Sequence, residues 1–335
     1  MSVDPDLAAM MDSVFADLRV NTAQMWSRLD NLGLVRLTGP ESVGGSGAGW
    51  PEAAELLSAA VRHGVRVPLA EHDLLACWLL DATATVYTPA RRTLALLDAD
   101  GRADGVPWCA DAERIVVVWP CAIDGADGYR LADVEPSELS ITKGANMIGE
   151  PRDTVVATGL SGVPVDPGLV AKVRHRAALI RAIQVCAALD RSLELSIEHV
   201  SSRVQFGRPL AKFQAIQNLI SDIAAESALA RAATEAALSR AIADDWAGRD
   251  VEFAVAVARS CAGHAASVAV RNAHQVHGAI GTTIEHRLHE YTRATLAWRS
   301  EYGSVRYWDQ RVADLAGTAP DLWGLIAPAP GARTP

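Results

Sequence analysis

The sequence of 335 residues predicts a mainly α-helical protein with a small central β domain, an α+β chain in three parts. Apolar residues recur every three or four positions toward both ends of the chain, which is the period of amphipathic helices. Between about 91 and 166 this period gives way to short β-rich runs. We therefore expect an N-terminal helical domain at 1–90, a reduced β domain at 91–166 and a C-terminal four-helix bundle at 167–325.

The N-terminal domain opens with a clear helix signal. Asp4 can cap a helix, Pro5 suits its first turn, and apolar residues follow at helical spacing as far as Leu18. Further helices are predicted from Pro51 and across the run AEHDLLACWLLDA. The glycines at 44–49 resemble a dinucleotide-binding loop, but no strand precedes them and their spacing differs, so we interpret them as a turn.

The central domain consists of short runs rich in β-forming residues. Turns such as DADG and DGADG separate these runs, so we predict a small, mainly antiparallel β unit. The predicted strands are Thr93–Leu97, Arg114–Trp119, Tyr129–Ala132, Leu139–Thr142 and Asp153–Ala157.

The C-terminal part carries four long helical patterns joined by short loops, which is typical of a helix bundle. Two breaks interrupt the bundle, Phe206–Leu210 and Gly278–Gly281. The last residues, 326–335, are rich in proline and are predicted to be disordered. The expected helices are 167–203, 211–245, 250–277 and 284–300.

Composition excludes several classes of function. The net charge is −9 and the basic residues are scattered, so no basic stripe is available to bind nucleic acid. The acidic start does not fit a secretory signal, and no uninterrupted apolar run reaches the roughly 18 residues of a membrane span. The five cysteines form no CxxC motif and are interpreted as reduced thiols. We expect a cytoplasmic protein.

The breaks in the bundle carry the most specific patterns. Residues 202–217, SRVQFGRPLAKFQAIQ, resemble the R-x-x-F-G-x-x-L-x-x-[FH]-Q-x-x-Q motif of acyl-CoA dehydrogenases. Residues 275–281, QVHGAIG, resemble the Q-x-x-G-G-x-G motif of the same family, and Pro40–Gly47 looks like its P-E-x-x-G-G-S-G turn. Together with the domain order, this resemblance covers nearly the whole chain.

The resemblance implies FAD as the cofactor, lying extended across a subunit boundary. A guanidinium can donate two parallel hydrogen bonds to a phosphate, and glycine lets the backbone approach closely. Taken singly, Arg203 could simply end a helix and Gly278 could be an ordinary helix cap. The residues that the family assigns to the diphosphate and adenosine half of a neighbour's FAD are Arg203, Phe206, Gln214, Gln275 and Gly278.

The family reaction uses a glutamate to remove the α-proton of an acyl-CoA thioester while the β-hydride leaves to the flavin. In many members this base lies 27 positions after the first glutamine of the Q-x-x-G-G motif, and that position is Tyr302 here. A phenol, with an ordinary pKa of about 10, is a poor base at neutral pH. The adjacent Glu301 is either the base or a solvated surface carboxylate. The position used by other members, on the first bundle helix, is Ala177.

The β domain also departs from the family pattern. The T-E-P-x-x-G-S-D loop, which holds the flavin ring in other members, has no counterpart. The segment 105–117 looks like the W-I-T strand, with Trp108 retained but Ala110 in place of the threonine. Trp108 is a candidate flavin contact, although a core position is the more ordinary role for tryptophan.

The chain thus retains the motifs for a neighbour's FAD and lacks those for its own flavin ring. This asymmetry resembles the smaller, non-catalytic-type subunit of the heterotetrameric (α2β2) acyl-CoA dehydrogenases of actinobacterial steroid breakdown. The resemblance implies a bulky, steroid-derived acyl-CoA substrate, a second dehydrogenase subunit that supplies the base, and an electron-transfer flavoprotein as acceptor. Two alternatives remain open: a self-sufficient homo-oligomer, dimer or tetramer, that uses Glu301, and a flavin-free structural or binding homologue.

Four histidines lie within 16 residues, in the pairs His274-x-x-His277 and His286-x-x-His289. Imidazoles three positions apart on a helix can converge on a metal ion. The Glu-x-x-His pairing of di-iron bundles is missing, however, and the family resemblance requires no metal. We therefore expect no metal ion and interpret these histidines as surface or helix-end residues.

Overall fold

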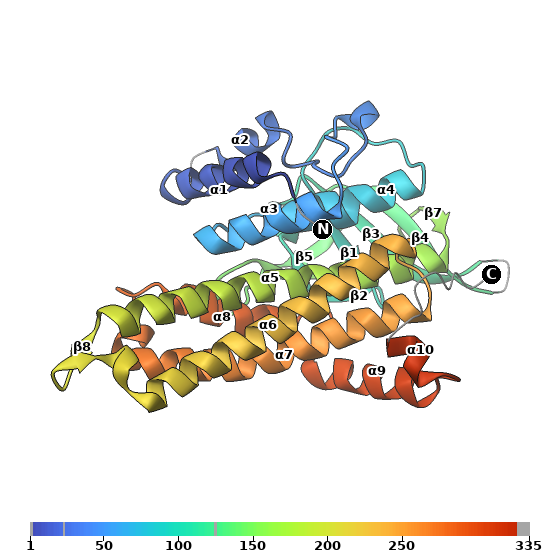
Figure 1. The fold of residues 1–335 in the computed structure, drawn as a ribbon. Coiled ribbons are helices and arrows are strands. Elements are labelled where there is room, and N and C mark those ends of the chain that lie inside the picture. The colour runs from blue at the N-terminus through green and yellow to red at the C-terminus, as the bar shows by residue number, and fades with distance from the viewer. Residues whose placement is uncertain (1–2, 23, 124–125, 327–335) are drawn as a thin grey trace. The chain divides into compact units, whose positions relative to one another are not determined.

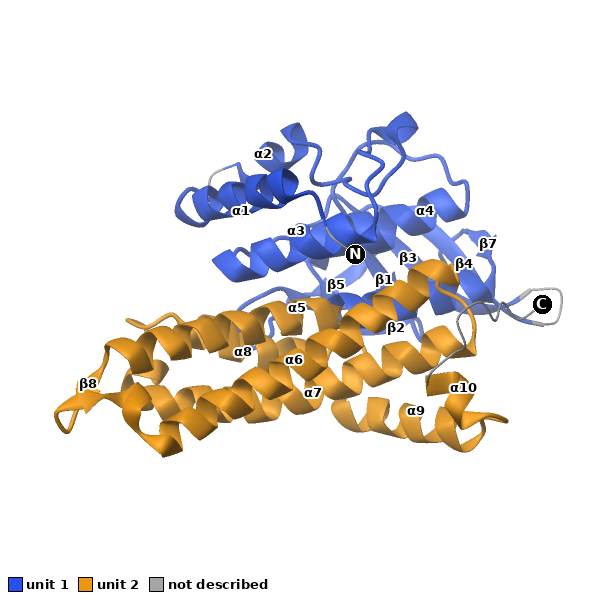
Figure 2. Cartoon of the chain, in the orientation of Figure 1, with its two compact units in different colours: residues 1–180 blue, residues 181–335 orange. Residues whose placement is uncertain are grey.

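The computed structural model describes residues 3–22, 24–123 and 126–326 (Figure 1). It divides into two compact units, Met1–Ile180 and Arg181–Pro335 (Figure 2). Helices dominate the beginning of the chain and the part after 167, and the two larger sheets lie between them, so the predicted fold class is confirmed. The three-part division into domains stays a prediction, and the tail predicted to be disordered lies outside the described residues from 327 onward.

The first helix forms where its sequence signal predicts. The side chain of Asp4 accepts the backbone N–H groups of Asp6 and Leu7, at 2.8 and 3.3 Å, and so caps the helix. Buried apolar residues of this helix share one core cluster with the third helix and the loops that follow. The glycine-rich segment is a turn, as predicted, built around a short 3₁₀ helix. The elements of this region are α1 Pro5–Val20, α2 Met25–Asn31, η1 Glu41–Val43 and α3 Trp50–His63.

The third predicted N-terminal helix begins as a π-helix, η2 Ala70–Cys77, and continues as α4 Trp78–Ala82. All eight residues of η2 are buried, including His72 and Asp73. Arg36 donates to Asp73 at 2.6 Å, and both side chains are almost fully buried. Burial, reinforced by nearby guanidinium groups, lowers the pKa of His72 to about 3, so this imidazole is neutral.

The central strands form two sheets, with strand orders β1-β3-β4-β7 and β2-β6-β5. All pairings in them are antiparallel except β1 with β3, which confirms the prediction of a mainly antiparallel unit. Strands β2 and β7 were not predicted, because β2 contains Gly105 and an irregular register, and β7 is only three residues long. The strands are β1 Arg92–Leu96, β2 Arg102–Pro107, β3 Arg114–Ile123, β4 Ala126–Val134, β5 Ser140–Thr142, β6 Arg152–Val156 and β7 Val163–Val165.

The four predicted bundle helices are present within a few residues of their expected bounds. Fully buried alanines recur along two of them, at 230, 237 and 241 and at 258, 262, 265, 266 and 269, and small side chains let helices pack closely. Two further helices follow that the sequence analysis did not predict, α9 Val305–Gly317 and α10 Leu322–Ile326. The bundle helices are α5 Pro167–Ser202, α6 Gln214–Ala243, α7 Arg249–His277 and α8 Leu288–Trp298.

One helical stretch, Arg249–Thr282, is long and apolar enough to cross a membrane by length and composition. Its most apolar window is 56% buried inside the structure, and Arg259 and Asn272 on the same helix are almost completely buried. The sequence predicted no membrane span because no uninterrupted apolar run is long enough, and this stretch is interrupted by charged and polar residues. Because the core helix of a globular protein passes the same test, the finding is weak evidence for a membrane span.

Candidate functional site

The first break in the bundle is a tight β-hairpin. Strands β8 Val204–Gln205 and β9 Arg208–Pro209 pair antiparallel, and Phe206 and Gly207 form the two-residue loop between them. Both loop residues have positive φ, 52° and 77°, which is the combination found in type I′ turns. Such a conformation is uncommon for phenylalanine, and this ring is 89% exposed. An exposed aromatic side chain in a strained backbone marks a candidate contact site.

The hairpin is held against the start of α6. The rings of Phe206 and Phe213 lie edge to face with centroids 6.2 Å apart, and the guanidinium of Arg208 lies 4.2 Å from the centroid of the Phe213 ring. The Leu210 N–H donates to the carbonyl of Arg203 at 2.9 Å. Gln214 is exposed on the first turn of α6. The hairpin, its approach and the first turn of α6 thus carry three exposed side chains, Arg203, Phe206 and Gln214.

The second break follows the end of α7 at His277. Gly278 has a φ of 64°, and a Cβ added there would meet nothing within 4 Å. Its N–H donates to the carbonyl of His274, so this N–H is not available to a ligand. What the glycine offers is an open surface beside the backbone. Gln275, one turn earlier, is exposed. The stacked rings of His199 and His277, with centroids 4.5 Å apart, bring the ends of α5 and α7 together, so both breaks lie at the same end of the bundle.

The candidate base, Glu301, is part of a partly buried cluster with Arg181 and Arg259. The Nε of Arg181 donates to its carboxylate at 2.7 Å, and the Arg181 side chain is only 2% exposed. Arg259 donates to the backbone carbonyls of Arg299 and Glu301, at 2.9 and 2.8 Å. Burial, together with the charge of Arg181, lowers the pKa of Arg259 to about 10. Glu301 is thus the counter-ion of this cluster, and accepting a proton would cost it the ion pair with Arg181.

Neither of the two positions that the family resemblance predicts for the base, Tyr302 and Ala177, carries a carboxylate. Tyr302 occupies the usual base position with a φ of 55°, and its ring lies 5.4 Å from the Arg181 guanidinium. Ala177, the alternative base position, is a fully buried alanine on α5. The two positions predicted for the base therefore hold a phenol and a methyl group.

Trp108 lies in the first compact unit, at the start of the short 3₁₀ helix η3 Cys109–Asp111. Its side chain is half-buried, and its backbone has a φ of 57°. The N–H of Ala110 donates to the carboxylate of Asp153 at 2.7 Å, so this backbone donor is already used. The structure places Trp108 in a different unit from the other five predicted FAD contacts, and its role stays a prediction.

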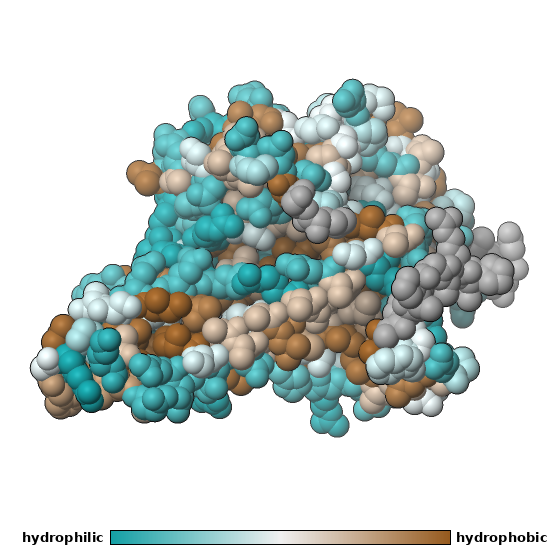
Figure 3. Space-filling view, viewed as in Figure 1, coloured by the Kyte–Doolittle hydropathy of each residue, from teal (hydrophilic) through white to brown (hydrophobic). Residues whose placement is uncertain are grey.

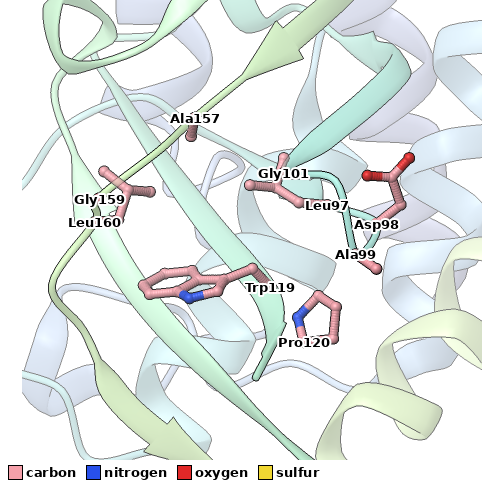
Figure 4. A pocket seen from close by; sticks show the side chains of 9 residues that line it. All are labelled: Leu97, Asp98, Ala99, Gly101, Trp119, Pro120, Ala157, Gly159 and Leu160. Carbon is pink, nitrogen blue, oxygen red and sulfur yellow. The ribbon is translucent and has the colours of Figure 1, made fainter. Parts of the chain in front are cut away.

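A small cavity of about 70 Å³ lies among the strands of the first unit (Figure 4). Its one carboxylate, Asp98, accepts the backbone N–H groups of Asp100 and Arg102, each at 2.9 Å, and so serves a turn. Trp119 and Leu160 give the cavity an apolar wall. It holds no constellation of acid, base or nucleophile. The lining residues are Leu97, Asp98, Ala99, Gly101, Trp119, Pro120, Ala157, Gly159 and Leu160.

Residues 173–305 match the family model of the acyl-CoA dehydrogenase C-terminal domain. This part of the chain, which contains both breaks and the Glu301 turn, belongs to the acyl-CoA dehydrogenase family, and the whole chain has the family's fold. The predictions of family, fold and enzyme class are thereby confirmed. The assignments of single residues are not tested by this match and stay predictions.

Among similar sequences, the acyl-CoA dehydrogenase IpdE2 of Mycobacterium tuberculosis is 28% identical over 295 residues, which cover 84% of this chain and 83% of IpdE2. The ChsE4–ChsE5 complex of the same organism contains a chain with a TM-score of 0.80 and 20% identity, covering 96% of this chain and 99% of that one. A variant of the Tcur3481–Tcur3483 steroid ACAD also has a TM-score of 0.80, with 22% identity and coverage of 93% and 97%. At these identities the two structures show the fold alone.

Sequence reasoning missed Arg181, Arg259 and His199. Arg181 and Arg259 are charged residues inside otherwise apolar helical runs, and this is the signal that could have drawn attention to them. His199 lies near the end of α5, far in sequence from the histidine pairs near the second break. Only the folded bundle brings it beside them.

Proposed function

We propose that this chain is a subunit of an FAD-dependent acyl-CoA dehydrogenase that catalyses α,β-dehydrogenation of an acyl-CoA thioester. In this proposal the chain contacts the ADP half of FAD, and a partner chain supplies the catalytic base. The observation that carries it is the hairpin tip, where Phe206 is 89% exposed in a strained conformation, with Arg203 and Gln214 exposed on the segments that flank the hairpin. Bound FAD would supply the hydride acceptor.

The residues at the two breaks fit the nucleotide end of FAD. An Arg203 guanidinium can bind a diphosphate oxygen pair, and the exposed face of Phe206 can stack on a purine ring. The open surface at Gly278 leaves room for a ligand to lie against the backbone. Because these groups face outward at the end of the bundle, they suit a cofactor shared with a neighbouring subunit.

The proposal that the base belongs to a partner is supported by the Arg181–Glu301 ion pair. A general base must reach the substrate proton within hydrogen-bond distance, either directly or through one water. Glu301 already accepts from a buried guanidinium, and its backbone carbonyl is held by Arg259. A carboxylate fixed in this way is suited to shaping the turn and poorly suited to carrying a proton.

Assembly with a second chain is supported by apolar side chains on the outside of the bundle. Leu229 and Ile242 on α6 are 56% and 38% exposed, and Ile197 on α5 is 45% exposed. Figure 3 shows an apolar band along α6.

We further propose a steroid-derived substrate, an electron-transfer flavoprotein as acceptor and a cytoplasmic location. The similarity to IpdE2 and to the ChsE4–ChsE5 and steroid ACAD structures supports the first of these.

The test is the retention of flavin by the purified chain, alone and co-expressed with a second acyl-CoA dehydrogenase chain. We expect flavin absorbance in the complex and a loss of FAD affinity of about tenfold or more in Arg203→Gln, since charge-assisted hydrogen bonds contribute roughly 1.5–3 kcal/mol. Arg231→Gln is the matched control, because Arg231 forms a surface ion pair with Asp190 on the outside of the bundle. Colourless protein in both preparations would refute the proposal.

A further inference from the structure

Three imidazoles from three separate elements meet in the second compact unit. His199 lies on α5, His277 is the last residue of α7, and His286 lies two residues before α8. One ring nitrogen from each lies within 4.8 Å of the other two. The ring centroids of His277 and His286 are 4.6 Å apart, and those of His199 and His277 are 4.5 Å apart. We propose that His199, His277 and His286 bind a divalent transition-metal ion of the zinc class.

His277 is oriented as a metal ligand requires. Its Nδ1 lies 2.8 Å from the carbonyl of Ala273, so Nδ1 carries the proton and Nε2 presents a lone pair. The residue is only 5% exposed, and its Nε2 has no hydrogen-bond partner among the described residues. A buried polar atom without a partner is unfavourable, and an ion at this position would satisfy it. A ring N–H donated to a backbone carbonyl is also the usual outer-shell arrangement of metal-bound histidine.

The donor set selects the class of ion. Three neutral imidazole nitrogens suit Zn²⁺, Co²⁺, Ni²⁺ or Cu²⁺, whereas Mg²⁺ and Ca²⁺ prefer oxygen ligands. Three protein ligands leave a fourth position for water, as in open zinc sites. The half-buried rings of His199 and His286 give solvent a route to that position.

Binding requires a small closure of the three rings. Nitrogens around a tetrahedral zinc ion are about 3.3 Å apart, given Zn–N bonds of about 2.0–2.1 Å. The outer rings, His199 and His286, must therefore approach His277 by roughly 1.5 Å from the 4.8 Å limit seen here. The Nδ1 of His286 accepts the Leu288 N–H at 3.1 Å, so an ion bound at this nitrogen replaces that hydrogen bond. An ion in this place would join the ends of α5 and α7 to the start of α8.

The proposed site differs from both histidine pairs seen in the sequence. His274 is directed elsewhere, because its Nε2 lies 2.9 Å from the hydroxyl of Thr292. The Nδ1 of His289 lies 2.8 Å from the backbone carbonyl of His286. Each pair therefore contributes one ligand, and α5 supplies the third. The inference departs from our expectation of a metal-free protein and does not depend on the proposed flavin chemistry.

The experiment titrates the full chain, after treatment with a chelator, with Co²⁺ alone and follows the visible absorbance of tetrahedral cobalt. We expect one saturable site per chain that Zn²⁺ displaces, and elemental analysis after zinc loading should give one equivalent. His199→Gln and His286→Gln should each weaken Co²⁺ binding at least tenfold. His264→Gln is the control, since His264 is an exposed histidine of α7 that pairs with Asp309, and its Co²⁺ affinity should equal that of the wild type.

The outcomes separate the alternatives. Circular dichroism identifies any variant that fails to fold. His199 and His286 are chosen for substitution because their rings are half-buried, whereas replacing the buried His277 could disturb the core. Wild-type protein without a saturable cobalt spectrum overturns the proposal, as does equal binding by the wild type, His199→Gln and His286→Gln. Loss of FAD in Arg203→Gln with normal cobalt binding would show that the metal site and the flavin site are independent.

Discussion

At the residue scale, the decisive group is Glu301, because its environment differs from that of a free catalytic carboxylate. It pairs with the buried guanidinium of Arg181, and Arg259 fixes the backbone beside it. One guanidinium, that of Arg181, thus binds the Glu301 carboxylate, and a second, that of Arg259, binds the backbone carbonyls just after α8. Such a cluster holds the turn at 300–304 in place, and it supports the proposal that Glu301 does not act as the base.

We predict that Glu301→Gln in the assembled enzyme leaves α-proton exchange of the substrate within about twofold of wild type. Loss of a true general base would lower exchange by roughly 10²–10⁴. Removal of the carboxylate charge should lower the free energy of unfolding by about 1–3 kcal/mol. The loss stays moderate because the amide oxygen can still accept from Arg181. Arg181→Gln is the matched variant, since it breaks the same ion pair while retaining the carboxylate. Loss of exchange only in Glu301→Gln would instead support the self-sufficient homo-oligomer.

At the element scale, the buried π-helix η2 makes the first unit sensitive to acid. Folded His72 has a pKa of about 3, whereas the unfolded chain takes up this proton near 6.5. The unfolded state therefore binds more protons between these values, and stability is full above pH 6.5 and falls as the pH decreases toward 3. Between pH 7 and 5.5 we expect His72 to account for a loss of about 1 kcal/mol.

The measurement is urea unfolding of the full chain at both pH values, for wild type and His72→Gln. Glutamine can still accept the Arg92 N–H that His72 Nδ1 accepts at 3.1 Å, but it does not titrate. The wild type should lose more stability than the variant on acidification. Parallel losses would show that this imidazole does not cause the pH dependence.

Elements with strong local signals could be predicted from the sequence, and those that depend on distant partners could not. The Asp4 cap and the helical spacing to Leu18 specified α1, because both act within a few residues. The sheet edge β7 and the π-helical winding of η2 depend on neighbours far along the chain, so local patterns did not reveal them. The same holds at the site, where Arg203 and Gly278 were identified from motifs but Arg181, Arg259 and His199 became visible only through packing.

At the scale of the whole molecule, the exposed apolar side chains of α6 predict association. Replacing Leu229 with lysine places a charge on this face without disturbing the core, since the side chain is 56% exposed. We expect Leu229→Lys to weaken association with a second subunit at least tenfold in sedimentation measurements, with unchanged circular dichroism. Val20→Lys, at an 87% exposed position on α1, is the control and should assemble normally. Equal assembly of both variants would exclude α6 as an interface.

The Arg181–Glu301–Arg259 cluster also constrains how the chain can evolve. A mutation that changes Tyr302 to glutamate would restore the family's usual base in one step, but the new carboxylate would arise beside Glu301 and could compete for the Arg181 guanidinium, over which the Tyr302 ring now lies. Regaining an independent active site would therefore require coordinated substitutions. In the arrangement that we propose, where a partner chain removes the proton, a single mutation in this chain would therefore not restore independent activity.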